Sequence, residues 1–291
     1  MLFLIEGFPS VIAAALAWHI IPDSPQTAPY LTTREKKVAR LRLQPEQQQP
    51  TTTHSALAVL TDPVAWLTAL ILFLTNMAYS SLPVFLPTIL HAMGHTPLMS
   101  QALSAPPYLA AFFIVLATAH ASDATRSRAP FLLAHAGLSC TGYAVLALGP
   151  RLGAPGSLVR YLAVYPAAVG FFNVVVLTIA WSVNNQRGGG ARRGAGFALM
   201  QVVGQCGPLV GTRLYPDREG PYYARGMAVC AVAMGGVVVL AMGLRWWMGR
   251  MNRRWEREER EEMEEGDGEE EGQALVGSGE RKAGRGFRYM L

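Results

Sequence analysis

The sequence has few charged residues and very few cysteines. Asp, Glu, Lys and Arg make up 15% of its 291 residues. Its three cysteines, Cys140, Cys206 and Cys230, show no Cys-x-x-Cys spacing and no accompanying histidine cluster. A disulfide framework and a zinc site are therefore excluded, because the first needs several paired cysteines and the second needs closely spaced ligands.

Sequence motifs of enzymes are also missing. There is no Gly-x-Ser-x-Gly, no His-Glu-x-x-His and no phosphate-binding loop, and no pair of acidic residues lies in an apolar segment. The glycine run at 188–190 is not followed by Gly-Lys-Ser/Thr, so we expect a loop there. We predict that the protein is not an enzyme and has no catalytic residue, no metal and no cofactor.

What the sequence does contain is a series of long segments without any charge. Six segments have no Asp, Glu, Lys or Arg: 64–90, 98–119, 129–149, 161–182, 194–212 and 226–244. A hydrocarbon core about 30 Å thick requires ~20 apolar residues of helix, whose backbone groups are paired inside the segment. Together with 1–21, the sequence predicts seven membrane-spanning helices. The fold class is an all-α polytopic membrane protein, with a six-helix bundle at 64–248 and one preceding helix.

Most of the charge lies outside these segments. Of the 25 basic and 20 acidic residues, 22 follow Leu244, so the net charge of +5 describes the flanks and not the body. The basic residues flank membrane segments, and we predict no nucleic-acid partner. Residues 249–291 include a Glu-rich run with almost no hydrophobic residue and are predicted to form a disordered, charged tail.

The basic residues also predict the orientation in the membrane. The loop 22–63 carries five Lys and Arg, the break 120–128 carries two and the break 183–193 carries three, whereas the alternate breaks carry five in total. Since Lys and Arg concentrate in cytoplasmic loops, the first set of loops and the C-terminal tail are predicted to be cytoplasmic. The expected location is the plasma membrane. Within 22–63, residues 32–43 are predicted to form an amphipathic surface helix that starts at a capping box, Thr32 to Glu35.

Polar side chains inside the spans mark where function is expected. The substrate-path candidates are Asn76, Tyr79, Tyr108, Tyr165, Asn173, Gln201 and Gln205. Polar residues of membrane helices either line a cavity or form hydrogen bonds between helices, and the residue types do not separate these alternatives. Asn76, Tyr79 and Pro83 share one helix face, and a proline there frees backbone carbonyls that protein or a cavity must satisfy.

Two further features allow alternative interpretations. Gly204, Gly207 and Gly211 lie in one span, the last two at Gly-x-x-x-Gly spacing, which favours close helix packing over an unwound segment that contacts substrate. Glu6 is an acidic residue in the first apolar segment. It is a candidate for coupling to a proton or cation, and the alternative is an interfacial residue.

A family resemblance emerges from short motifs spread along the chain. They are Glu6-Gly7-Phe8-Pro9, Leu31-Thr32-Thr33-Arg34-Glu35, Leu86-Pro87-Thr88-Ile89-Leu90, Ser104-Ala105-Pro106-Pro107-Tyr108, Trp181-Ser182-Val183-Asn184-Asn185, Gly204-Gln205-Cys206-Gly207-Pro208 and Phe287-Arg288-Tyr289-Met290-Leu291. The chain resembles fungal major facilitator permeases of the allantoate permease type, in the anion:cation symporter family, and within them the nicotinic-acid-transporter-like group. The resemblance covers the sixth helix and the second six-helix half.

This resemblance implies a function and a mechanism. Such permeases import small organic anions or vitamins, such as nicotinate or allantoate, with protons and by alternating access. The loop with Asp123, Arg126 and Arg128 corresponds to the family's cytoplasmic gating loop, which clasps neighbouring helix ends. The substrate site lies between two halves of the fold, so the expected partners are a small-molecule solute, the lipid bilayer, and either a missing N-terminal half or a second chain.

Three interpretations of the chain remain open at this point. The first is a permease that is truncated at its N-terminus. The second is a half-transporter that dimerises or pairs with another chain. The third is a membrane sensor or scaffold that does not transport, whose Glu-rich tail is the working part.

Overall fold

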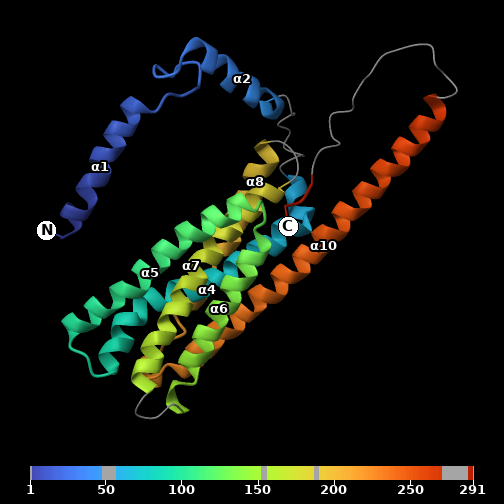
Figure 1. Cartoon of the computed structure of the whole chain (residues 1–291). Coiled ribbons are helices and arrows are strands. Elements are labelled where there is room, and N and C mark those ends of the chain that lie inside the picture. Colours follow the sequence, from blue (N-terminus) through green and yellow to red (C-terminus); the bar gives the residue numbers. More distant parts are fainter. Residues whose placement is uncertain (1, 48–56, 152–155, 187–189, 271–287, 291) are drawn as a thin grey trace. The chain divides into compact units, whose positions relative to one another are not determined.

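The computed structural model describes residues 2–47, 57–151, 156–186, 190–270 and 288–290, and these form helices and loops without a strand (Figure 1). Two compact units divide the chain, one made of Met1–Thr52 with Gly188–Ala191 and the other of the remaining residues. Each unit is described by itself.

The first unit contains helices α1 (Leu2–Ile20) and α2 (Thr33–Gln47). The apolar part of α1, Gly7–Ile20, is shorter than a membrane span. The capping box predicted at the start of α2 is present. The Glu35 carboxylate accepts 2.8 Å hydrogen bonds from the backbone N–H and the hydroxyl of Thr32, and the Thr32 hydroxyl accepts one of 3.4 Å from the Glu35 N–H.

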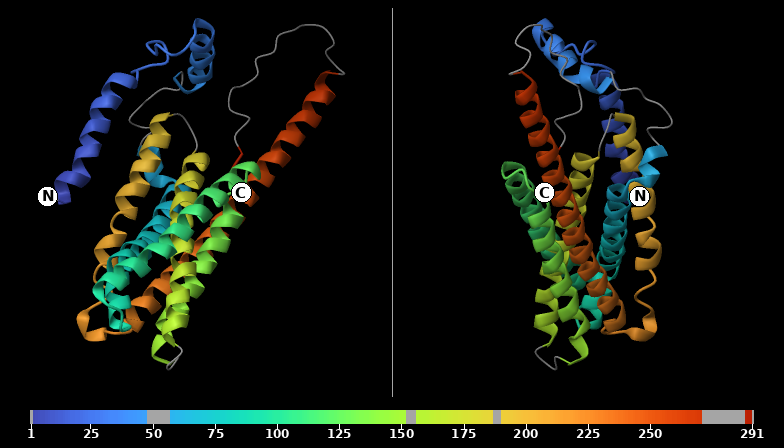
Figure 2. Two further views of the ribbon diagram at one scale, coloured as in Figure 1. Left: turned by 60° about the vertical axis from the view of Figure 1, so that its left-hand side comes forward. Right: turned by 90° about the vertical axis from the view of Figure 1, so that its right-hand side faces the viewer.

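The second unit is a bundle of helices that run alternately up and down (Figure 2). Its helices are α4 (Pro63–Ala92), α5 (Pro97–Ala124), α6 (Ala129–Ala147), α7 (Gly156–Asn185), α8 (Gly190–Gly204, from Arg192 onward), α9 (Gly207–Gly211) and α10 (Ala224–Glu270). Short 3-10 helices lie at Ala58–Thr61, Gly149–Arg151 and Asp217–Glu219. Within the described residues, α4, α5, α6, α7 and α10 are long and apolar enough to cross a membrane.

The helix starts follow from capping residues beside prolines. Asp62 caps α4 by accepting a 2.9 Å hydrogen bond from the N–H of Val64, and Pro63 occupies the first helical position. Thr96 caps α5 in the same way through the N–H of Met99 at 3.3 Å, followed by Pro97. Proline suits this position because its missing N–H has no partner inside a helix in any case.

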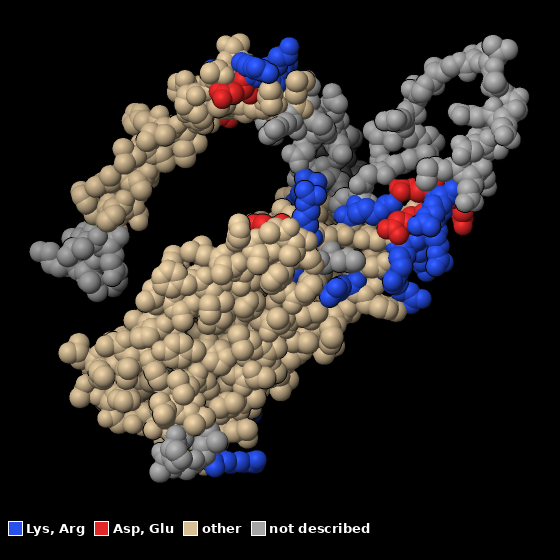
Figure 3. Space-filling view, viewed as in Figure 1, with Lys and Arg blue, Asp and Glu red and all other residues tan. Residues whose placement is uncertain are grey.

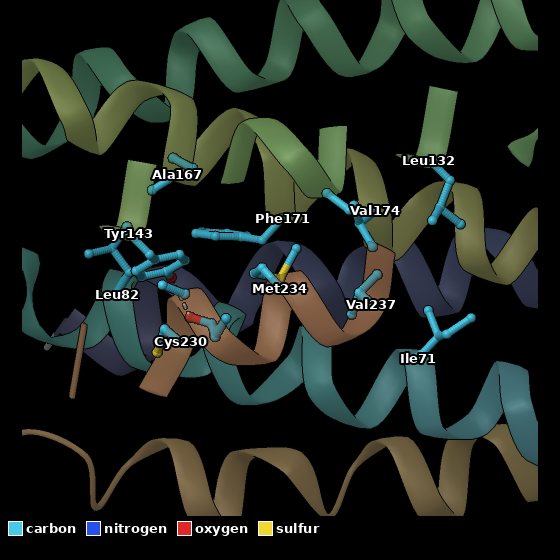
Figure 4. Close-up of a cluster of buried hydrophobic side chains, with 14 of the residues drawn as sticks. Ile71, Leu82, Leu132, Tyr143, Ala167, Phe171, Val174, Cys230, Met234 and Val237 are labelled. Atoms are coloured by element: carbon cyan, nitrogen blue, oxygen red, sulfur yellow. Dashed lines mark hydrogen bonds between the residues drawn. The ribbon is translucent and has the colours of Figure 1, made fainter. Parts of the chain in front are cut away.

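The buried core lies between α4, α6, α7 and α10. Figure 4 shows Phe171 and Val174 of α7 facing Met234 and Val237 of α10, with residues of α4 and α6 completing the cluster. Two glycines, Gly142 of α6 and Gly170 of α7, bring these helices together. A Cβ atom on Gly142 would lie 2.5 Å from the Ala167 nitrogen. The small residue therefore allows backbone contact between the two helices.

The last helix differs from the sequence expectation. Residues 249–291 were expected to be disordered, but α10 continues without interruption to Glu270, a total of 47 residues. The expectation was wrong for 249–270, because Glu, Arg and Met are strong helix formers and opposite charges recur four residues apart, as in Glu256 and Arg260. Of the rest of the predicted tail, residues 271–287 and 291 lie outside the described residues, and residues 288–290 are held by hydrogen bonds to Asn252 and Asn185.

The charged side chains are unevenly placed on the bundle. On the face shown in Figure 3, the body of the second unit carries almost no Lys, Arg, Asp or Glu, and these side chains gather where the charged part of α10 leaves the bundle. The Asp62 carboxylate lies at this end and pairs with Arg192 at 3.1 Å. A charge-free helical body is what a hydrocarbon environment requires.

Candidate functional site

An aromatic cluster joins three helices near the middle of their length. The ring of Phe172 in α7 lies 5.4 Å from that of Tyr79 in α4 and 5.9 Å from that of Tyr108 in α5, both edge to face. Phe171 adds a further edge contact with Tyr79 at 5.6 Å. Edge-to-face geometry is the preferred arrangement of aromatic pairs. The structure thus brings together two of the predicted substrate-path residues, Tyr79 and Tyr108.

The two tyrosines differ in how their polar groups are placed. Tyr79 keeps 38% of its surface exposed. The hydroxyl group of Tyr108 is buried and has no hydrogen-bond partner among the described residues. A buried polar group without a partner costs about 1–3 kcal/mol, so this hydroxyl is available to a polar group that enters the cluster.

A second polar group lies on α7, nearer the end of the bundle where α7 begins. The Tyr161 hydroxyl donates a 3.0 Å hydrogen bond to the carbonyl of Leu103 in α5. That carbonyl lacks its usual partner because Pro107, four residues later, has no N–H. The predicted site residue Tyr165 lies beside this pair, with its hydroxyl 3.3 Å from that of Tyr161.

The segment expected to be one continuous span at 194–212 is broken in the structure. Helix α8 ends at Gly204, α9 starts at Gly207, and Gln205 and Cys206 lie exposed in the turn between them. The break arises because Pro208 cannot donate to the Gly204 carbonyl. The side-chain amide of Asn76 in α4 donates to this carbonyl instead, at 3.1 Å.

The glycines of this segment pack directly on α4. A Cβ atom on Gly207 would lie 2.4 Å from the carbonyl oxygen of Phe73, and one on Gly211 would lie 2.4 Å from that of Met77. A Cβ atom on Gly204 would lie 2.7 Å from the Leu72 side chain. Close packing and a helix break therefore occur together, although the sequence presented them as alternatives.

The remaining candidates lie in separate places. Asn173 is buried and donates to the Val169 carbonyl of its own helix at 2.7 Å. Gln201 is half-buried in α8, and Gln205 is exposed in the turn after it. The side chain of Glu6 lies outside the described residues, and its backbone belongs to α1 in the first unit.

The predicted gating loop forms a compact local clasp. Arg128 pairs with Asp123 and donates a 3.1 Å hydrogen bond to the Ser122 hydroxyl, which itself donates to the Ser127 carbonyl at 3.0 Å. Arg126 is exposed and adopts a positive φ of 50°. The clasp ties the end of α5 to the start of α6.

Sequence reasoning missed several residues near these sites. Phe171 and Phe172 gave no signal, because a phenylalanine in an apolar span is indistinguishable from ordinary core. Arg160 was counted as a loop residue, but it lies in the first turns of α7 and is buried. It donates a 3.1 Å hydrogen bond to the Pro221 carbonyl and stacks on the Tyr222 ring at 4.6 Å. In the described parts of the chain, no group of three His, Cys, Asp or Glu side chains is placed to hold a metal ion.

Long apolar helices whose central stretches lack charge, together with a broken helix and an aromatic cluster at mid-height, define a multi-pass α-helical membrane protein. The family model of the Major Facilitator Superfamily matches residues 1–212, and the chain belongs to this family. Membership agrees with the prediction that the chain is not an enzyme, since the curated relatives are named as transporters.

Three relatives illustrate the similarity. The MFS transporter prlL of Fungal sp. (strain NRRL 50135) is 30% identical over 263 residues, which are 88% of this chain and 52% of the relative. The major facilitator-type transporter hxnP of Emericella nidulans is 25% identical over 295 residues, 100% of this chain and 58% of the relative. The high-affinity nicotinic acid transporter of Saccharomyces cerevisiae is 26% identical over 168 residues, 58% of this chain and 30% of the relative.

The chain spans about half the length of the first curated relatives that it matches. No solved structure matches the chain significantly.

Proposed function

We propose that this chain forms one wall of a secondary active transporter that carries a small organic anion or vitamin, such as nicotinate or allantoate, together with protons. The observation that carries the proposal is the aromatic cluster of Tyr79, Tyr108 and Phe172, which joins three helices at mid-height. Transporters of this architecture bind solutes near the bilayer midplane. Flat aromatic rings and a buried hydroxyl suit a small planar ring that carries polar substituents.

Relatives give independent support for the solute class. One relative is named a high-affinity nicotinic acid transporter, and others are named as major facilitator transporters. Nicotinate is a planar aromatic carboxylate, so its ring could stack or meet an aromatic edge. Asp, Glu, Lys and Arg are absent from the stretches 64–90, 98–119, 161–182 and 226–244 of the spanning helices. The counter-charge for a carboxylate would therefore come from a facing bundle or from helix termini.

We further propose that transport requires a second six-helix bundle facing α4, α5, α7 and α8. Alternating access moves two bundles around a site between them, and one bundle supplies only one wall. The facing bundle is either a preceding half of the same protein or a second copy of this chain. The plasma membrane is the proposed location, with the charged end of α10 in the cytoplasm.

Uptake assays in yeast test this function. Radiolabelled nicotinate and allantoate uptake would be measured in cells that lack their own carriers, with the chain expressed alone. It would also be measured with the chain replacing the second half of the S. cerevisiae nicotinic acid transporter. Uptake by the chimaera but not by the chain alone supports a facing half from another segment. Uptake by the chain alone supports pairing of two copies.

A clear negative outcome is also defined. A chimaera that reaches the membrane in normal amounts, yet takes up neither solute, would contradict the proposed solute class. If the charged part of α10 binds a partner protein in that case, the sensor or scaffold interpretation would be favoured.

A further inference from the structure

The short segment Arg288–Met290 lies against the end of α7 and the part of α10 from Trp247 to Glu259. Asn252 of α10 accepts a 3.0 Å hydrogen bond from the backbone N–H of Tyr289 and donates one of 2.9 Å to the carbonyl of the same residue. An asparagine side chain can do both because it carries an acceptor and two donors in one plane.

Asn185 of α7 forms the same pair of hydrogen bonds with the backbone of Met290. Its side-chain oxygen accepts from the Met290 N–H at 2.7 Å, and its amide nitrogen donates to the Met290 carbonyl at 3.2 Å. The indole N–H of Trp181 donates to that carbonyl as well, at 2.8 Å. The backbone N–H and C=O groups of two successive residues are therefore satisfied by side chains of two different helices, without any strand pairing.

Side chains of the segment are recognised in addition to its backbone. The Tyr289 ring is 5% exposed and lies 5.3 Å from the ring of Trp255 and 5.9 Å from that of Trp247. The guanidinium of Arg288 pairs with Glu259 at 2.5 Å. Asn184 donates to the Met290 sulfur at 3.3 Å. Each of the three residues thus meets a partner of matching chemistry.

We propose that the end of α7 and the part of α10 from Trp247 to Glu259 form a binding site for an extended peptide with the pattern Arg-Tyr-apolar, and that residues 288–290 are its resident ligand. Bound there, the peptide bridges two helices, because Asn185 and Trp181 belong to α7 whereas Asn252 and Trp255 belong to α10. Occupancy of the site then holds the end of α7 against α10. The proposal is independent of transport, since it rests on contacts within one bundle.

Disulfide trapping tests the placement directly. In the full chain, Asn184→Cys with Met290→Cys puts two thiols where the structure has a side-chain contact. The matched control is Val183→Cys with Met290→Cys, because Val183 is the preceding residue of α7, is 41% exposed and points in another direction. Mass spectrometry of digested, oxidised protein reports both cross-links and separates them from links to the native cysteines.

The expected result is that the 184–290 pair forms at least about tenfold faster than the 183–290 pair, since the bound segment has a high local concentration. Adding Asn252→Ala to the 184–290 pair is expected to slow its formation toward the control rate. Equal rates for the two pairs, or a rate that Asn252→Ala leaves unchanged, would overturn the proposal.

Hydrogen exchange tests the same proposal without relying on the cysteine variants to fold. In the unmodified chain, the Tyr289 and Met290 amides are expected to exchange more slowly than in the Asn185→Ala and Asn252→Ala double variant, by about tenfold or more. Free exchange of both amides in the unmodified chain would also overturn the proposal.

Discussion

The side-chain amide of Asn76 donates to the carbonyl of Gly204 across 128 residues of sequence, at 3.1 Å. The carbonyl needs this partner because Pro208 stands where the helix would otherwise supply an N–H. A helix break in the middle of a membrane bundle is thereby stabilised by a neighbouring helix.

The first prediction concerns this hydrogen bond. Asn76→Ala should lower the free energy of unfolding by about 1–3 kcal/mol, because it leaves the buried Gly204 carbonyl without a donor. Thermal unfolding in detergent measures the loss. Asn173→Ala is the matched control and should lower the free energy of unfolding by less, because among the described residues Asn173 bonds only to a carbonyl of its own helix. Pro208→Ala restores a backbone N–H at position 208. In that background, Asn76→Ala should lower the free energy of unfolding by less than it does in the unmodified chain. Equal costs in both backgrounds would refute the role assigned to Pro208.

The second prediction concerns the close packing of α9 on α4. Gly207→Ala and Gly211→Ala should each destabilise the bundle by about 1–3 kcal/mol, because the added methyl group meets a backbone oxygen. Gly243→Ala, where a Cβ atom would meet nothing within 4 Å, should have no such effect. The melting temperatures of the three variants test this, and a tolerated Gly207→Ala would show that α9 can move away from α4.

The third prediction separates binding from stability with two tyrosines. Tyr108→Phe removes a buried hydroxyl without a partner, so it should leave stability equal or raise it by up to about 1 kcal/mol. If this hydroxyl meets the solute, the same change should lower uptake by the nicotinate chimaera. Tyr161→Phe should do the opposite and lower stability, since it uncovers the Leu103 carbonyl. Uptake that Tyr108→Phe leaves unchanged would remove the hydroxyl from the proposed site.

The fourth prediction concerns pH and the start of α2. Two hydrogen bonds from Thr32 lower the pKa of the Glu35 carboxyl below its ordinary value. A lowered pKa in the folded state means that the carboxylate stabilises the helix start at pH values above the ordinary pKa of Glu, and that this stabilisation is lost as the pH falls through the lowered pKa. Amide exchange in the first turn of α2, corrected for the intrinsic pH dependence of exchange, should report the loss. Glu35→Gln should make the corrected protection independent of pH in this range, and a surviving dependence would contradict the assignment.

The membrane fold could be predicted from sequence, because a span without charges has one physical explanation. The position of the break between α8 and α9 could not be predicted from the sequence. Gly204 and Pro208 hinted at it, but the donor Asn76 lies far away in sequence, and no local pattern identifies such a partner. Two members of the aromatic cluster, Tyr79 and Tyr108, were predicted as site residues because a hydroxyl in an apolar span is a polar group that needs a partner. Phe172 was not predicted, because a phenylalanine in such a span is typical of the core.

At the charged end of α10 the sequence analysis predicted too little structure. Its composition predicted disorder because it contains almost no hydrophobic residue, yet the same residues are strong helix formers with alternating charge. Composition describes how much apolar surface a segment can bury, whereas helix propensity describes whether it can form a helix. The few apolar residues of this segment, Met251 and Trp255, also pack against the core.

The tyrosine that covers the Leu103 carbonyl also bears on how this chain can change over generations. As long as Pro107 is present, loss of the Tyr161 hydroxyl exposes an unpaired carbonyl to an apolar environment. Once Pro107 has been replaced by a residue with an N–H, the same loss becomes nearly neutral. The order of the two substitutions therefore decides whether an evolving lineage passes through a destabilised intermediate. Which residues are tolerated at position 161 depends on the residue at position 107, on another helix.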